Sequence, residues 1–273
     1  MKYTIGITTF EHRYEKYFKP LLLQIKKNLP DVEVIVYVNG QYDKAFNNSY
    51  RSKLLCMISE QKNVFPIISP YFKGLSKIWN AIIVQSSNNN IFILNDDIWL
   101  DDTFFLQIPE MFNITKLSSF RLNGSFSHFC VNRNEVFEVG FFDERLIGLG
   151  EEDGDWCFRW ERFYQKHLPM LQTPFVHSFY NVTDSKNSEN MEKDKTWGKY
   201  TPWNARWLFS NKYNPDDIQL ALTQGFPANG QGGMYGKPVA IREDCKNLDY
   251  YPAEKFFWDH INELKQGNEL LEI

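Results

Sequence analysis

Two acidic segments are the places where this sequence could do chemistry. Asn95-Asp96-Asp97 follows the apolar run Ile91–Leu94, and adjacent carboxylates after a strand can bind a hard divalent cation, which prefers oxygen ligands. A bound Mg²⁺ or Mn²⁺ would bridge the phosphates of a nucleotide and neutralise charge as a diphosphate departs. The alternative is that Asp97, Asp101 and Asp102 favour the start of a helix. The segment alone does not decide between the two interpretations.

The second acidic segment, Gly148–Asp155, places four carboxylates within five residues. A partly desolvated carboxyl group among like charges has its pKa raised, which suits a general base. The flanking glycines permit backbone angles that would place a carboxylate at the start of a helix, predicted from about Asp155 to Lys166, facing a ligand. An acidic first turn that complements the helix dipole is the alternative. It leaves the glycines and Trp156 unexplained.

The elements that would position these segments alternate between strand and helix. Strands are predicted at Tyr3–Thr9, Val32–Val38, Val64–Ile68 and Ile91–Leu94, and helices at Tyr14–Asn28, Leu54–Glu60 and Leu75–Gln85. This order predicts parallel pairing with right-handed crossovers, and so an open α/β sheet. Ligands of such sheets bind at the carboxyl ends of the strands, where we expect the polar residues that end them to converge. These residues are Thr8, Thr9, Asn39, Asn95, Asp96 and Asp97.

The second half of the chain changes character. Ser118–Asn132 carries further strand-like segments, and Arg133–Gly140 has a helical pattern. Trp197, Trp203 and Trp207 could form a platform for a sugar, although a place in the core is the better explanation. The glycine-rich stretch Gly225–Gly236 is either a mobile lid or a simple connection.

The composition bounds the class of protein. With 43% hydrophobic and 16% aromatic residues in 273, the chain can bury a core, which excludes global disorder. The net charge of −4 argues against nucleic acid as the main partner. The apolar runs are far shorter than the roughly 20 residues of a membrane span, and four scattered cysteines fit reduced thiols. We therefore expect a cytoplasmic protein without a transmembrane segment, with peripheral contact to the inner face of a membrane left open.

Together these segments resemble the family 2 inverting glycosyltransferases of the GT-A fold, especially rhamnosyltransferase-like members. The family's L-N-x-D-V segment is matched by Leu94–Ile98, its V-G-x-F-D-E by Val139–Glu144 and its E-D-x-D-L-x-x-R by Glu152–Arg159. Val176-His177 resembles a later histidine element. Gly148–Asp155 is also similar to the G-W-G-x-E-D-D-D signature of the β-1,4-galactosyltransferases.

The resemblance implies a GT-A-type nucleotide-diphospho-sugar transferase fold, with a mostly parallel central sheet flanked by helices. The core would span residues 1–180, with a donor half at about 1–100 and an acceptor half at about 101–180. Residues 181–273 would form a helical or irregular C-terminal extension packed on that core.

The resemblance also implies a role for each matched residue. Asp153 would be the catalytic base, with Glu152 orienting the acceptor. Asp97 and His177 would bind Mn²⁺ or Mg²⁺, and Trp156 and Asp155 would contact the acceptor. The donor would be bound by Thr8, Thr9, Asn39, Lys77, Asn80, Asn95 and Asp96. Asn39 stands where the family usually has Asp, which leaves the base of the nucleotide open.

The implied activity is a single in-line displacement. A hexosyl or deoxyhexosyl group would pass from a UDP- or dTDP-linked sugar to a hydroxyl of a glycan or lipid-linked saccharide, in surface-polysaccharide biosynthesis. Two alternatives stand beside it. The chain could be a non-catalytic nucleotide-sugar- or glycan-binding module of the same fold, or a glycoside hydrolase that uses two carboxylates, for example Asp97 and Asp153.

Overall fold

The structure is a computed structural model that describes residues 2–40, 47–70, 73–144, 146, 151–178 and 204. The chain divides into two compact units. The first unit comprises Met1–Lys73, Ala81–Asn134 and Pro169–Asn187, and the second comprises Gly74–Asn80, Glu135–Leu168 and Ser188–Ile273. Helices α3 and α5 contribute residues to both units. Each unit is described by itself below.

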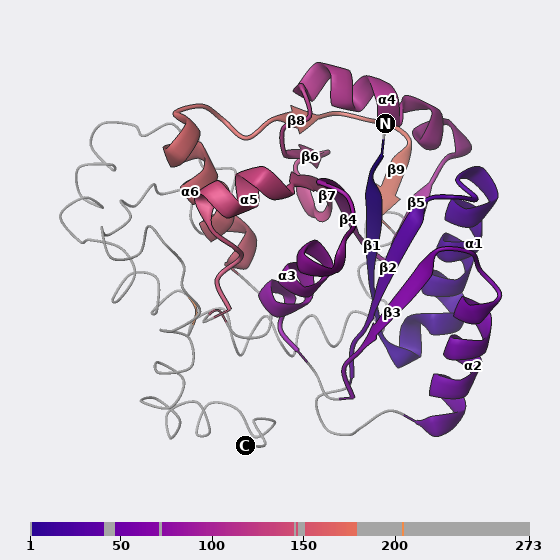
Figure 1. Cartoon of the computed structure of the whole chain (residues 1–273). Helices are drawn as coiled ribbons and strands as arrows, with labels where there is room; N and C mark the ends of the chain where they lie inside the picture. Colours follow the sequence, from indigo (N-terminus) through magenta and orange to yellow (C-terminus); the bar gives the residue numbers. More distant parts are fainter. Residues whose placement is uncertain are drawn as a thin grey trace, which may run out of the picture. The chain divides into compact units, whose positions relative to one another are not determined.

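A seven-stranded sheet forms the centre of the first unit (Figure 1). Its strands β1, β2, β3 and β4 are parallel, whereas β7 runs antiparallel to both β4 and β6. The order across the sheet is β3 (Val64–Ile68), β2 (Glu33–Val38), β1 (Thr4–Thr9), β4 (Asn90–Asn95), β7 (Ser125–Asn132), β6 (Phe120–Leu122) and β8 (Met170–Leu171). This mostly parallel sheet, flanked by helices, confirms the predicted fold class.

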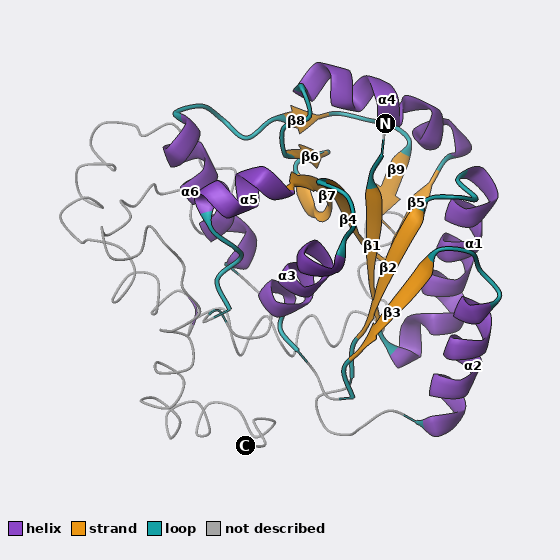
Figure 2. Cartoon of the chain, in the orientation of Figure 1, coloured by secondary structure: helices purple, strands orange, loops and turns teal. Residues whose placement is uncertain are grey.

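Helices cover both faces of the sheet (Figure 2). One face packs against α1 (Lys19–Asn28), α2 (Asn48–Ser59) and α4 (Asp102–Thr115) in a single apolar core. The opposite face receives α3 (Leu75–Gln85) at Gly6, where an added Cβ would lie 2.4 Å from Ile82 Cγ2. Glycine therefore allows the close approach of α3 to the central strand β1.

Two predicted helices begin elsewhere than expected. α2 starts at Asn48 because the Asn47 side chain caps it, with Oδ1 accepting a hydrogen bond from the Ser49 amide at 2.8 Å. The predicted helix Tyr14–Asn28 is α-helical only from Lys19. A 3₁₀ turn (Glu11–Arg13) and a π-helical turn (Tyr14–Phe18) come before it. Pro20 has no N–H, so it cannot donate the α-helical hydrogen bond to the carbonyl four residues earlier. This favours the π-helical turn before α1.

The acidic pair after β4 lies in a turn between two strands. Asp96 and Asp97 connect β4 to the short strand β5 (Ile98–Leu100), which pairs antiparallel with β9 (Val176–Ser178). The helix that follows, α4, has Asp101 at its N-cap position. The alternative interpretation of Asp97 as the start of a helix is therefore wrong, because a strand follows it directly.

The second unit is built around α6 (Glu152–Tyr164), which begins three residues before its predicted start. Most of α5 (Arg133–Val139) and residues 75–80 of α3 belong to the same unit. Trp79, Phe142, Trp156 and Trp160 are buried in it. Trp79 and Phe142 meet edge to face at 4.9 Å between ring centroids, and Phe142 stacks on Trp156 at 5.2 Å.

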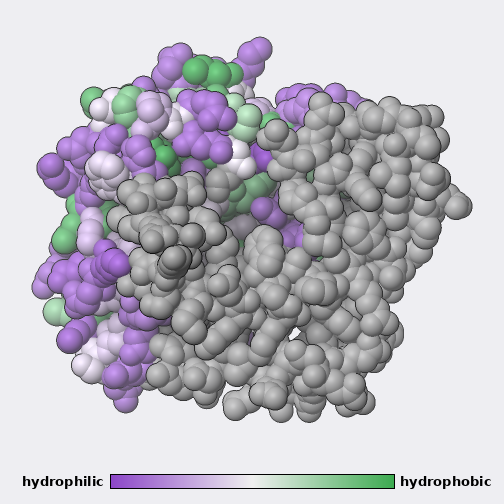
Figure 3. Space-filling model, turned by 180° about the vertical axis from the view of Figure 1, so that it is seen from behind, coloured by the Kyte–Doolittle hydropathy of each residue, from purple (hydrophilic) through white to green (hydrophobic). Residues whose placement is uncertain are grey.

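On the face seen in Figure 3, the described residues are mostly hydrophilic, with hydrophobic side chains at scattered positions. Within the described part of the chain, no helix is both long and apolar enough to cross a membrane. Cys56, Cys130 and Cys157 carry free thiols. The expectations for the extension at 181–273, for Trp197, Trp203 and Trp207, and for Gly225–Gly236 lie outside the described residues.

Candidate active site

Polar side chains converge at the carboxyl ends of β1, β2 and β4, as the sequence predicts. The sheet order changes direction between β1 and β4, which makes this edge the topological switch point where open sheets bind ligands. Thr8 is in register with Asn95, and the Asn39 amide donates to the Thr9 carbonyl at 2.9 Å. The structure thus brings together six of the predicted residues: Thr8, Thr9, Asn39, Asn95, Asp96 and Asp97.

Arg13 joins this group, although the sequence did not single it out. Its Nη1 lies 2.9 Å from Asp96 Oδ1 and 3.4 Å from Asp97 Oδ2. The pKa of the Asp96 carboxyl is raised to about 6, because burial and, to a smaller degree, the Asp97 charge outweigh the lowering effects of Arg13 and the Thr9 hydroxyl. Asp96 is completely buried, whereas the Asp97 side chain is 18% exposed. Asp97 is therefore the carboxylate that a ligand can reach.

His128 is a second residue that sequence reasoning missed. It lies on β7 opposite Leu94 and is buried. Burial lowers its pKa to about 4, although the Asp97 charge acts in the opposite direction, so the imidazole is neutral at physiological pH. Neither of its nitrogens has a hydrogen-bond partner among the described residues, and the same holds for Asp96 Oδ2 and the Thr8 hydroxyl.

Such buried polar groups without partners carry a cost. Each costs roughly 1–3 kcal/mol if it stays unpaired, and native proteins leave few of them. Three of them gather at one edge of one sheet, next to a partly exposed carboxylate. A ligand or ordered water at this edge would satisfy them, which marks it as the candidate site.

The Asn39 side chain has a structural role at this edge. Its Nδ2 donates to the Lys73 carbonyl at 2.9 Å, and its Oδ1 accepts from the Lys73 amide at 2.8 Å. The buried amide thus holds the chain that follows β3. The predicted direct contact to a donor base requires these two hydrogen bonds to break.

His177 lies on β9, in register with Trp99 of β5, whose ring it stacks on at 5.0 Å between centroids. Its Nε2 is 3.5 Å from Asp101 Oδ2. No three side chains of His, Cys, Asp or Glu come together as a metal cluster within the described ranges. His177 therefore forms a pair with Asp101, and the structure does not group the two with Asp97.

The residues at the switch point fit a divalent cation of the Mg²⁺ type. Such ions are commonly held by one or two carboxylates together with substrate phosphates, so a cage of three protein ligands is not needed. Asp97 offers a partly exposed carboxylate, and Asp96 Oδ2 is an acceptor without a partner among the described residues. These oxygens match the ligand preference of Mg²⁺ and Mn²⁺.

In the second unit, the predicted base and its neighbour lie in the first turn of α6. Asp153 is partly exposed, and its Oδ1 accepts a hydrogen bond from the Gly154 amide at 2.8 Å, whereas Glu152 is buried. Asp97 belongs to the first unit and Asp153 to the second. That the two face each other across one cleft stays a prediction. Packing buries neither carboxylate completely.

Glu151, in the same acidic segment, has a strongly raised pKa. Burial raises its pKa to about 9, and the charges of Asp153, Glu152 and Asp155 add to the effect. Its backbone is left-handed, with φ of 82°, which is a strained conformation for a residue other than glycine. The density of carboxylates predicted a raised pKa in this segment. The sequence did not indicate that Glu151 would carry it.

Two residues predicted to contact an acceptor are buried in the scaffold. Asp155 Oδ2 forms a buried ion pair with Arg159 Nε at 3.0 Å, and the Arg159 guanidinium also donates to the carbonyls of Val139, Gly140 and Phe141. Trp156 is fully buried, and its Nε1 donates to the Gly140 carbonyl at 3.0 Å. Both side chains hold residues 139–142 against α6, and their predicted acceptor contacts stay predictions.

Lys77 and Asn80, two predicted donor-binding residues on α3, differ in their exposure to solvent. Lys77 is exposed, whereas Asn80 is buried and its amide is fully used. Asn80 Nδ2 donates to the Phe142 carbonyl at 2.8 Å and to Glu144 Oε1 at 3.0 Å, and Oδ1 accepts from the Phe142 amide. Asn80 therefore has a structural role in this unit, and its predicted contact with the donor stays a prediction.

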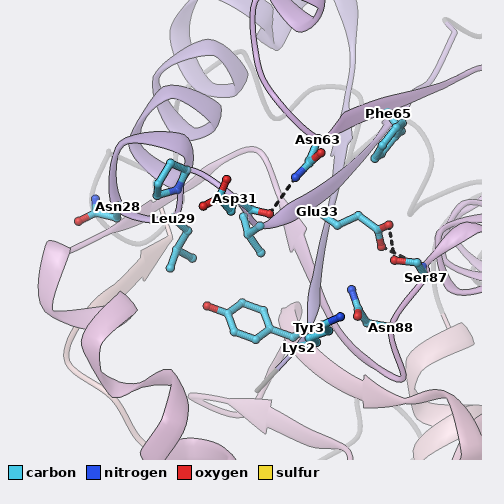
Figure 4. A pocket seen from close by; sticks show the side chains of 12 residues that line it. Lys2, Tyr3, Asn28, Leu29, Asp31, Glu33, Asn63, Phe65, Ser87 and Asn88 are labelled. Carbon is cyan, nitrogen blue, oxygen red and sulfur yellow. Dashed lines mark hydrogen bonds between the residues drawn. The ribbon is translucent and has the colours of Figure 1, made fainter.

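A cavity of about 580 Å³ opens at the opposite edge of the sheet, where the parallel strands begin (Figure 4). Tyr3, Glu33, Asn63 and Asn88 line it, each at or just before the start of a strand. The Asn63 side chain donates to the Asp31 carbonyl and the Ser87 hydroxyl to Glu33, so these polar groups already have partners. The cavity lies away from the switch point.

No protein-family model matches the chain, and no curated protein matches it. Solved structures are similar in fold. The structure of S. aureus TarS aligns with a TM-score of 0.52 at 13% identity, over 81% of this chain and 42% of TarS. Its 1–349 segment aligns with a TM-score of 0.50 at 13% identity, over 85% of this chain and 81% of the segment.

A third similar structure is glucosyl-3-phosphoglycerate synthase from Mycobacterium tuberculosis, in complex with Mn²⁺, uridine diphosphate and glucosyl-3-phosphoglycerate. It aligns with a TM-score of 0.51 at 10% identity, over 77% of this chain and 79% of the synthase. At such identities the likeness concerns the fold alone, and the chain spans less than half the length of the longer TarS structure. The sheet order and these neighbours show that the protein has the GT-A fold of glycosyltransferases.

Proposed function

We propose that this protein is a metal-dependent, inverting glycosyltransferase. It moves a hexosyl or deoxyhexosyl group from a UDP- or dTDP-linked sugar to a hydroxyl of a glycan or lipid-linked saccharide in surface-polysaccharide biosynthesis. One observation carries the proposal. Buried polar groups that have no partner among the described residues gather beside a partly exposed Asp97, at the switch point of a GT-A sheet.

The first unit supplies the donor site in this proposal. Thr8, Thr9 and Asn95 line the ends of β1 and β4, where the nucleotide and its phosphates would lie. Asp97 would hold Mn²⁺ or Mg²⁺, which supplies positive charge to the departing diphosphate. Lys77, which is exposed on the part of α3 that belongs to the second unit, would add a further positive charge near the phosphates. We propose Asp97 as the main ligand and His177, paired with Asp101, as a secondary one.

The second unit supplies the proton acceptor. Asp153 would take the proton of the acceptor hydroxyl, which attacks the anomeric carbon from the face opposite the leaving group. Glu152, in the same turn of α6, would orient that hydroxyl. The clamp of Arg159, Asp155 and Trp156 fixes the first turn of α6, so that both carboxylates start from a rigid support.

The test is a panel of nucleotide sugars assayed with Mn²⁺ for hydrolysis or transfer, first with the wild-type protein and then with D153N. Removal of a general base costs on the order of 10²–10⁴ in rate, and UDP affinity should stay within about twofold. Thermal unfolding of D153N serves as the folding control. Equal loss of turnover and of nucleotide affinity in D153N would contradict the assignment of Asp153. Nucleotide binding without turnover of any nucleotide sugar would favour the binding module.

A further inference from the structure

The segment between β1 and α1 has an unusual backbone that the proposed function does not explain. A 3₁₀ turn ends at Arg13, and a π-helical turn follows before α1 begins. π-Helical turns are rare and often occur at functional sites. Tyr14, Tyr17 and Phe18 of this turn are buried, which anchors it in the core. The segment therefore holds Arg13 at a defined place beside the end of β4.

The Arg13 guanidinium lies where a cation would have to lie. Its Nη1 contacts one oxygen of Asp96 at 2.9 Å and one of Asp97 at 3.4 Å, and its side chain is only 15% exposed. The completely buried Asp96 retains an oxygen, Oδ2, with no partner among the described residues. The pair of carboxylates thus has its charge partly balanced by a cation that the chain itself supplies.

The two contacts differ in strength. The contact with Asp96 involves a completely buried carboxylate, and breaking it would leave a buried charge unpaired, which is strongly unfavourable. The contact with Asp97 is longer, at 3.4 Å, and reaches a carboxylate that is 18% exposed, so its loss costs less than loss of the contact with Asp96. Arg13 can therefore release Asp97 while it keeps Asp96.

We propose that Arg13 is a tethered counter-ion that competes with the divalent cation for Asp97. Without metal, the guanidinium bridges both carboxylates. Metal binding replaces its contact with Asp97 and leaves its contact with Asp96 in place. Arg13 thus sets the metal affinity of the site and keeps it low until a donor brings phosphate oxygens as further ligands. The inference rests on the proposed metal site at Asp97.

Mn²⁺ binding in the absence of nucleotide tests the inference, with free Mn²⁺ measured by electron paramagnetic resonance. A unit charge a few ångströms from a divalent ion repels it enough, even in a water-like dielectric, to weaken binding by about tenfold or more. We expect R13Q to bind Mn²⁺ at least about tenfold more tightly than the wild type. K16Q is the matched control, since it removes one positive charge from an exposed position of the same segment. Its affinity should equal that of the wild type.

A second variant guards against a folding defect in R13Q, which leaves Asp96 without its buried partner. R13K keeps a positive charge beside Asp96, but the ammonium group lacks the planar fork that spans two carboxylates. It should also bind Mn²⁺ more tightly than the wild type. Circular dichroism melting identifies which variants are folded.

The possible results separate the inference from the proposed function. Mn²⁺ binding that is unchanged or weaker in every folded Arg13 variant overturns the role of Arg13, and the function stands if D97N reduces binding. No Mn²⁺ binding by any variant, with or without UDP, overturns the proposed metal site and the inference together. Tighter binding in R13Q or R13K that D97N abolishes supports both.

Discussion

The two edges of the central sheet are both polar, but their carboxylates differ in how fully hydrogen bonds within the chain satisfy them. At the edge where the strands begin, the Glu33 carboxylate accepts hydrogen bonds from the Thr4 hydroxyl at 2.5 Å and from the Ser87 amide at 2.9 Å. Burial alone would raise its pKa, but hydrogen bonds from Ser87, Thr4 and Ser86 outweigh this and lower it. The Glu33 carboxylate is thus satisfied within the chain, although the buried Arg133 Nε at the same edge has no partner among the described residues.

At the edge where the strands end, several buried side-chain atoms have no hydrogen-bond partner among the described residues. The pKa of the Asp96 carboxyl is raised by burial, and Asp96 Oδ2, the Thr8 hydroxyl and both His128 nitrogens have no partner among the described residues. A cavity of about 580 Å³ lies at the other edge. The unmet hydrogen-bonding capacity of buried groups is the observation that points to the carboxyl edge as the place where a ligand binds.

The largest expected effect is the difference in turnover between a variant at the carboxyl edge and a variant at the amino edge of the sheet. D97N removes the charge of the accessible carboxylate at the carboxyl edge, and we expect turnover of a nucleotide sugar to fall by about 10²–10³, as for loss of an electrostatic group in a transition state. D31N removes an exposed carboxylate from the cavity at the amino edge and should change turnover less than about twofold. Steady-state kinetics with Mn²⁺ measures both. A similar loss in the two variants would break the comparison.

Substitutions of two glutamates, Glu151 and Glu33, should respond to pH in opposite directions. The pKa of Glu151 is raised to about 9, so the folded protein holds its proton more tightly than the unfolded chain. Its contribution to stability therefore falls as the pH rises from the usual range near 4.5 towards 9. Gln cannot ionise, so E151Q should gain about 1–3 kcal/mol over the wild type between pH 5 and pH 8, measured by urea unfolding.

E33Q should behave the other way. The pKa of Glu33 is lower in the folded protein than its usual value. The ionised carboxylate therefore stabilises the fold above the usual pKa, and this stabilisation is lost as the pH falls through the lowered pKa. E33Q should cost about 1–3 kcal/mol at pH 7, as for hydrogen bonds to a charged group, and less at pH 3. The same direction of change in E33Q and E151Q would argue against the different environments of the two residues.

The smallest expected effect is the change in stability on replacing either of two threonines that lie on the same face of β1. Thr4 is bonded to Glu33, Ser86 and Asn88, whereas the buried Thr8 hydroxyl has no partner in the described chain. T4V should destabilise the protein by about 1–3 kcal/mol, and T8V should be neutral or stabilise it by up to about 1 kcal/mol. Urea unfolding measures both. Equal destabilisation by both substitutions would mean that the Thr8 hydroxyl is satisfied in solution.

The sequence could predict the sheet because apolar strands and amphipathic helices alternate in a simple order. It could also predict that Thr8, Asn95 and Asp97 would meet, since the carboxyl ends of parallel strands share one edge. It could not show that the side chains of Asn39 and Asn80 form hydrogen bonds with backbone groups. The partner of Asn39 lies 34 positions along the chain, and the partner of Asn80 lies 62 positions along it. Polar residues that match a motif can be part of the scaffold.

Arg13 and His128 could not be predicted for related reasons. The contact of Arg13 with Asp96 spans 83 positions and depends on the π-helical turn that Pro20 favours. His128 is buried because the register of β7 places it opposite Leu94, and single-sequence patterns do not fix register. Asp155 and Trp156 match a family motif, but their pairing with Arg159 and Gly140 emerges only when α6 packs on residues 139–142.

The most direct test of the account is a crystal structure with UDP and Mn²⁺, with the metal located by anomalous scattering. We predict an anomalous peak about 2.0–2.2 Å from a carboxylate oxygen of Asp97, with the nucleotide across the ends of β1 and β4. A nucleotide in the cavity lined by Tyr3, Glu33 and Asn88, or a metal that Asp97 does not touch, would contradict the account.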